Sequence, residues 1–173
     1  MKRLALLALL LTATPVAADI AHQGQHSPYA GQEARDIKAL SPEEIADLNA
    51  GRGMGLALAA ELNGYPGPRH VLDLAQELQL TAEQRRRTSA LFDAMRMETS
   101  ALGGRLIEAE RTLDRLFAEK RATPQSVAAA TKAAGAAEGE LRAAHLRYHL
   151  AMVDVLTAEQ VATYDRLRGY ARH

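Results

Sequence analysis

The sequence predicts an all-α protein built as a long antiparallel helical hairpin with short flanking helices. The five-residue word LTAEQ occurs twice, at 80–84 and 156–160. Each copy places threonine three residues before glutamine, the pattern of a capping box that begins a helix. Between the copies lie two long helix-forming segments, interrupted once at Thr123-Pro124. One interruption between two long helices predicts a hairpin.

Composition and charge limit the function classes. The chain has 173 residues, no cysteine and 4% aromatic residues. Stability must therefore come from helix packing around a thin core and not from disulfides. Formal net charge is zero over the whole chain, and without the first 18 residues 19 basic side chains face 21 acidic ones. This near-neutral balance argues against general binding of nucleic acid.

The first 18 residues have the pattern of a signal peptide. Lys2 and Arg3 form its charged end, residues 4–11 its apolar run, and Val16-Ala17-Ala18 a small-residue cleavage site. The apolar run is too short to span a bilayer, and no later stretch is continuously apolar for the roughly 20 residues that a membrane helix needs. We therefore expect a periplasmic protein that begins at Asp19 and has no transmembrane anchor after signal cleavage.

Residues 19–40 are expected to form a flexible polar arm, because glycine and proline interrupt this segment repeatedly. The arm carries His22 and His26, whose four-residue spacing on a helix would direct both imidazoles toward one metal ion. Gly24 lies between them and disfavours a helix. A polar leader without a metal site is therefore the competing interpretation.

Residues 41–68 are expected to form a short helical block. Ser41-Pro42 followed by two acidic residues is a strong helix start, and the first helix should end near Gly51. Gly53 and Gly55 follow. Because no strand precedes them, they predict a turn or close helix packing and not a nucleotide-binding loop.

Residues 69–173 are expected to form the hairpin domain. Its first long helix runs from Ala82 to about Arg121, and both long helices have apolar or small residues at heptad-like steps of three and four. If the chain turns at residues 122 and 123, a residue of the first long helix lies opposite the residue of the second for which the two residue numbers add up to about 245.

Two glycines, Gly103 and Gly104, lie in the middle of the first long helix, and they predict a bend or a close contact there. The alanine-rich tip should be thin, and an antiparallel homodimer would complete the burial.

The two LTAEQ words match the LTxxQ motif of the Spy and CpxP family of periplasmic stress proteins, which the chain resembles over about residues 70–170. The matching residues are Leu80, Thr81 and Gln84 in the first copy and Leu156, Thr157 and Gln160 in the second. The resemblance implies a curved helical dimer that acts without ATP and either holds unfolded proteins in a cradle or restrains a sensor kinase. The metal-responsive relatives ZraP and CnrX bind metals instead or as well.

A cradle for clients needs apolar patches bordered by charge. The candidate client-binding residues are Arg85, Arg86, Met95, Met97, Leu102, Leu106 and Ile107. Helical periodicity does not separate side chains that face the hairpin seam from side chains that face a client. In the competing interpretation the methionines and leucines belong to the core and the arginines to a solvated face.

The candidate metal site is His145, His149 and Met152, on one face of the second long helix. The pairing register places His149 near Met95. Imidazole and thioether groups suit zinc, copper, nickel or cobalt. In the competing interpretation the histidines are interior groups with hydrogen-bond partners.

An enzyme is not expected. The chain has no cysteine and no serine in a nucleophile-elbow motif, and the acidic pair Glu43-Glu44 is explained by helix capping. The resemblance to the Spy and CpxP family implies a periplasmic, ATP-independent chaperone or stress adaptor, for which no cofactor is expected. Its partners would be a second copy of itself and unfolded proteins or a sensor kinase. The alternative is a periplasmic heavy-metal-binding sensor or resistance protein.

Overall fold

The computed structural model describes residues 27–170. The expected signal peptide, His22 and His26 lie outside the described residues. The chain divides into two compact units, residues 1–31 and 32–173, and the second unit contains all the elements discussed below. Every regular element in the described part is helical, so the predicted all-α class is confirmed. None of the helices between residues 27 and 170 is both long and apolar enough to cross a membrane.

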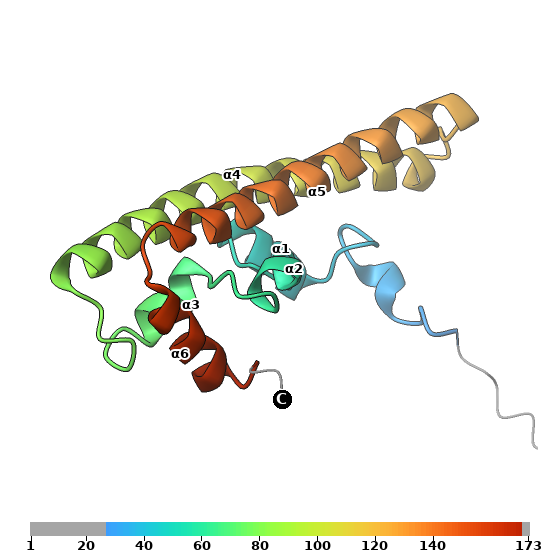
Figure 1. The fold of residues 1–173 in the computed structure, drawn as a ribbon. Helices are drawn as coiled ribbons and strands as arrows, with labels where there is room; N and C mark the ends of the chain where they lie inside the picture. The colour runs from blue at the N-terminus through green and yellow to red at the C-terminus, as the bar shows by residue number, and fades with distance from the viewer. Residues whose placement is uncertain (1–26, 171–173) are drawn as a thin grey trace, which may run out of the picture. The chain divides into compact units, whose positions relative to one another are not determined.

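The second unit consists of a long hairpin and short helices packed along one part of it (Figure 1). A 3-10 turn comes first, at Gln32–Ala34. The helices that follow are α1 (Pro42–Asn49), α2 (Leu58–Glu61), α3 (Pro68–Asp73), α4 (Ala82–Ala118), α5 (Pro124–Val153) and α6 (Ala158–Arg168). Helices α4 and α5, of 37 and 30 residues, form the predicted hairpin.

Side-chain contacts across the hairpin fix its register. Glu98 accepts hydrogen bonds from Arg147 and from the Tyr148 hydroxyl, the latter at 2.8 Å. Nearer the tip, Arg105 forms an ion pair with Glu140 at 2.8 Å. The residue numbers of these pairs sum to 245 or 246. The predicted register is therefore confirmed.

The predicted helix starts have the predicted chemistry. At α4 the Thr81 hydroxyl accepts from the Gln84 backbone N–H at 3.1 Å, and the Gln84 side chain accepts from the Thr81 N–H at 3.0 Å. At α6 the same two bonds join Thr157 and Gln160, at 3.2 and 2.9 Å. Capping boxes also begin helices α1 and α5. Local sequence therefore sets where these helices begin.

The N-terminal block packs against the middle of the hairpin through one apolar cluster. Its buried members are Ile37, Leu48, Leu102, Leu106, Ile107, Leu141 and Ala144. Gly103 permits the close approach of α1, because a Cβ at this position would lie 2.4 Å from the Leu48 carbonyl oxygen. Ile37, within the segment expected to be an arm, is fully buried, and residues from Gln32 onward belong to the second compact unit.

A second apolar cluster lies where both motifs meet the flanking helices. Its buried members are Val71, Ala75, Leu78, Leu80, Met152, Val155, Leu156 and Tyr164. Both motif leucines are therefore core residues. At the opposite end of the hairpin, α4 has no buried residue beyond Ile107. The core thus lies at the motif end and the middle of the hairpin, and the tip is thin as predicted.

Candidate functional site

The two LTAEQ motifs are joined through their glutamine side chains. The Gln84 amide donates to the Gln160 side-chain oxygen at 2.7 Å and to the Val155 carbonyl at 2.9 Å. The Gln160 amide donates to the Gln84 side-chain oxygen at 3.1 Å and to the Leu78 carbonyl at 3.1 Å. Each side-chain oxygen also caps its own helix. The motifs therefore form one polar junction, which we call the glutamine junction.

A buried acid, Glu61, lies at the end of α2. Its side chain is 6% exposed and accepts hydrogen bonds from the Tyr164 hydroxyl and, at 3.2 Å, from the Gly67 backbone N–H. Three further groups surround the carboxylate: His70 Nδ1 at 3.2 Å, His149 Nδ1 at 3.7 Å and Arg168 Nε at 3.7 Å. Glu61 therefore connects the N-terminal block to α3, α5 and α6.

The surroundings of Glu61 favour its charged form. Burial alone would raise the pKa of Glu61, but His70, the Tyr164 hydroxyl and the nearby His149 outweigh burial and lower it to about 2. Burial and the same carboxylate raise the pKa of Tyr164. The site therefore holds an ionised carboxylate and a protonated phenol, which is the pairing that a strong hydrogen bond between them requires.

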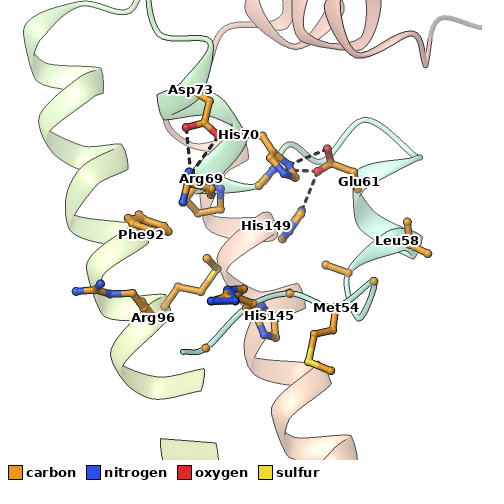
Figure 2. Close-up of a pocket in the computed structure, with 18 of the residues that line it drawn as sticks. Met54, Leu58, Glu61, Arg69, His70, Asp73, Phe92, Arg96, His145 and His149 are labelled. Carbon is orange, nitrogen blue, oxygen red and sulfur yellow. Dashed lines mark hydrogen bonds and ion pairs between the residues drawn. The ribbon is translucent and has the colours of Figure 1, made fainter. Parts of the chain in front are cut away.

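A pocket of about 800 Å³ opens next to Glu61 (Figure 2). Its walls come from the glycine-containing loop after α1, from α2 and α3, from α4 and α5, and from the end of α6. The residues with side chains at the pocket include Arg52, Met54, Leu58, Glu61, Arg69, His70, Asp73, Phe92, Met95, Arg96, His145, His149, Arg168 and Tyr170. A volume of this size is typical of small-molecule sites.

Two of the three predicted metal ligands on α5 line the pocket, and the third lies in the apolar core. His145 and His149 line the pocket, as does Met95, which the register placed near His149. Met152 is fully buried in the apolar cluster at the motif end. In the part of the chain that the structure describes, no group of three or more His, Cys, Asp or Glu side chains is placed to hold a metal ion.

The two pocket histidines differ in how they are held. His149 Nδ1 lies 2.7 Å from the Tyr65 carbonyl oxygen, and Gly67 packs so closely on the ring that a Cβ there would lie 2.8 Å from Cε1. His145 is 2% exposed, and its Nε2 has no hydrogen-bond partner in the structure. Burial, with a contribution from His149, lowers the pKa of His145. These surroundings favour the uncharged form of the His145 imidazole and leave one of its nitrogens unsatisfied.

The predicted client-binding residues do not share one surface. The methionine and aliphatic residues of that set that are buried are Met95, Leu102, Leu106 and Ile107. They are core residues in this structure, because the N-terminal block covers the side of the hairpin on which the last three lie. Met97 is 75% exposed, and Arg85 and Arg86 are exposed. Only these three remain available to a client in this conformation.

Sequence reasoning did not identify Glu61 or its partner Tyr164. Glu61 lies among alanines and leucines, so a charged residue within an apolar run was the one local sign of burial. Its main partner lies 103 residues further along the chain. A contact of that separation leaves no local pattern, and only the fold brings the two together.

The part of the chain that matches a known protein family begins and ends at helix boundaries of the structure. A family model described as "LTXXQ motif family protein" matches residues 68–168. The match begins with α3, ends with α6 and includes both motifs and the whole hairpin. It covers more than half of the chain. No curated protein and no solved structure matches the chain.

Proposed function

This chain belongs to the LTXXQ motif family, and from that premise we propose that it is a periplasmic protein of the Spy and CpxP type. In this proposal it acts without ATP as a chaperone or stress adaptor and holds unfolded or signalling proteins on its hairpin. Catalysis forms no part of the proposal.

The observation that carries this proposal is an apolar stripe on α5 that neither core cluster uses. The stripe consists of Leu146, Leu150 and Val153, at steps of four and three. Leu150 is 58% exposed and Val153 is 45% exposed. Helical residues at these spacings share one face, so the stripe offers a continuous apolar surface on the hairpin. Exposed apolar surface of this kind marks an interaction site.

Charge next to the stripe supports weak, reversible binding. Arg147 follows Leu146 directly and is exposed. Arg85 and Arg86, at the start of α4, are exposed at the same end of the hairpin. Charge of this kind speeds the encounter with a partner, whereas a small apolar area limits affinity. Transient holding of clients needs this combination.

Replacing both Leu150 and Val153 with serine is expected to lower the suppression of client aggregation by about half or more, because most of the exposed area of the stripe is removed. The measurement is light scattering of a chemically denatured client, with EDTA and without ATP. Leu167→Ser is the matched control, since Leu167 is 48% exposed on α6. Equal suppression by wild type and the double variant, or an equal loss in the control, would contradict the proposal.

The proposal includes a homodimer, which the family resemblance implies and which would reduce the solvent exposure of the hairpin. Light scattering on the samples used for the aggregation assay measures this directly. We expect the mass of two copies at micromolar concentration, and a monodisperse monomer would contradict the dimer.

Heavy-metal binding is the second candidate function, and the pocket histidines favour it. His145 has a free nitrogen, His149 lies one helical turn away, and Met95 adds a thioether to the same pocket. Imidazole nitrogen and thioether sulfur are ligands for zinc, copper, nickel and cobalt. In this alternative the protein would be a periplasmic metal sensor or resistance protein.

If a metal binds in the pocket, replacing His145 and His149 with alanine should weaken its affinity by about 100-fold or more, because two ligands are lost. Titration calorimetry with each of the four metals measures this, in a background in which His22 and His26 are also alanine. Met152→Leu is the control, and we expect no change because Met152 lies in the apolar core. Unchanged affinity in the histidine double variant would remove this site.

A further inference from the structure

Residues 32–50, which include the 3-10 turn and α1, lie along the middle of the hairpin (Figure 1). We call this segment the strap. Within the strap, every residue of which the structure describes, Ile37 and Leu48 are the two buried residues. They pack on an apolar face that both long helices build, which we call the covered face: Leu102, Leu106, Ile107, Leu141 and Ala144. Few apolar side chains therefore hold the strap in place.

The strap also makes polar contacts with α4. The Ser100 hydroxyl donates to the Asn49 carbonyl oxygen at 2.6 Å, and the Lys38 ammonium lies 3.6 Å from the Asp114 carboxylate. Lys38 is half exposed, and ion pairs in contact with water contribute little to stability. Ser100 and Asp114 are only partly buried, so water would reach both groups if the strap left. The polar contacts therefore oppose release of the strap only weakly.

A loop with two left-handed glycines connects the strap to α2. Gly51 has a φ of 65° and Gly55 a φ of 79°. Glycine populates positive and negative φ with similar ease, so this loop can change conformation without strain. Beyond the loop, Glu61 accepts a hydrogen bond from Tyr164 of α6. The strap can therefore leave the hairpin while α2 stays attached to the rest of the protein.

The strap lies outside the part of the chain that matches the LTXXQ family, whereas the covered face lies inside it. The match covers residues 68–168, which include every residue of the covered face. A hairpin without the strap would expose this face to water. Contiguous apolar surface of this kind gains free energy when apolar side chains of another chain segment bury it.

We propose that the strap is an intramolecular competitor of client segments. While the strap is docked, the covered face is closed, and when the strap leaves, the face takes an apolar segment of an unfolded protein. This inference rests on the proposed function, because it adds a second surface on which the hairpin holds clients. A docked strap lowers the apparent affinity of the face in proportion to the fraction of molecules that are closed. Loosening the strap should therefore strengthen client binding.

Gly103→Ala loosens the strap from the side of the hairpin. The added Cβ would lie 2.4 Å from the Leu48 carbonyl oxygen, a backbone atom, so α1 has to move. Gly104→Ala is the matched control, since no atom lies within 4 Å of a Cβ at that position. Both changes raise helix propensity by the same amount, so the two variants differ in their effect on the strap.

Ile37→Ala loosens the strap from its own side and leaves the covered face unchanged. Ile37 is fully buried, so its truncation removes apolar contact from the strap. Ala39→Ser, at an exposed position of the same segment, is its control. Circular dichroism and thermal melting check that the hairpin remains folded in all four variants.

Hydrogen exchange of the α1 backbone amides measures whether the strap opens. Helix α1 has eight residues, too few to persist alone in water, so its amides lose protection when it leaves the hairpin. We expect exchange at least about tenfold faster in Gly103→Ala and Ile37→Ala, and wild-type exchange in the two controls. Wild-type exchange in both loosened variants would show that the strap is a permanent part of the fold and would overturn the proposal.

Fluorescence anisotropy measures client binding, with reduced and carboxymethylated α-lactalbumin as a permanently unfolded client. The client contains tryptophan and this chain has none, so tryptophan emission reports the client alone. We expect the two loosened variants to bind at least about threefold tighter than wild type, and the controls to bind as wild type does. Faster exchange without tighter binding would overturn the proposal.

A combined variant separates this inference from holding of clients on the α5 stripe. The covered face does not include the stripe, so adding Gly103→Ala to the Leu150→Ser, Val153→Ser variant should restore binding of the client. Binding by Gly103→Ala but not by wild type would contradict the stripe and support the covered face. Binding that the double variant loses and Gly103→Ala does not restore would support the stripe and contradict the covered face.

Discussion

Replacing Gln84 with leucine is expected to lower the free energy of unfolding by about 3 kcal/mol. Leucine keeps the size of the side chain but removes the helix cap, the bond to the Val155 carbonyl and the reciprocal bonds with Gln160. Each group left without a partner in this half-buried site costs about 1–3 kcal/mol. Urea unfolding followed by circular dichroism measures the loss. Gln125→Leu, at an exposed position near the start of α5, should change stability by less than about 0.5 kcal/mol.

A second variant separates the two roles of Gln84. Gln84→Glu keeps an oxygen that caps α4, but it can no longer donate to the Val155 carbonyl. We expect a loss of about 1–2 kcal/mol, between wild type and the leucine variant. The double variant with Gln160→Leu should lose less than the two single variants together, because they share a bond. Additive losses would show that the glutamine junction is not a unit.

Replacing Glu61 with glutamine is expected to cost about 3 kcal/mol at pH 7, and the cost should shrink in acid. The pKa of this carboxyl is about 2 in the folded protein, against an ordinary value of 4.5. A lowered pKa contributes stability that is fully present above pH 4.5 and is lost as the pH falls toward 2. At about 1.4 kcal/mol for each unit, the full contribution is about 3 kcal/mol.

The measurement is urea unfolding of both proteins between pH 7 and pH 3. The difference between wild type and Glu61→Gln should fall by more than half over this range. Glu77→Gln replaces an exposed glutamate before α4 and should change stability by less than about 0.5 kcal/mol at pH 7. A difference for Glu61→Gln that does not vary with pH would show that its effect comes from packing and not from its charge.

Local patterns were sufficient to predict the helices and their pairing. The Thr81 and Gln84 capping box involves residues three apart, and the register follows from the position of the turn at Thr123-Pro124. Gly103 was predicted to mark a bend or a close contact, and the structure shows a close contact with α1. Gly104 has no such neighbour. These predictions succeeded because each depends on chain geometry within a few residues or on one known turn.

The pocket and the coverage of the hairpin were not predictable in the same way. Leu102, Leu106 and Ile107 were offered as client-binding residues because a two-helix arm leaves one side open. In the structure Ile37 and Leu48 cover that side. Which face of a helix receives a separate segment depends on contacts between distant residues. Periodicity identifies an apolar face, but it does not identify what covers it.

The glutamine junction also limits how the length of the hairpin can change. Gln84 and Gln160 meet at one end while the chain turns at the other. A residue inserted in α4 alone would shift every pair across the seam and move Gln84 out of reach of Gln160. A longer or shorter hairpin therefore requires matched insertions or deletions in both helices, in steps of about seven residues that keep the same faces together. The contact between the two motifs thus constrains the lengths of α4 and α5 relative to each other.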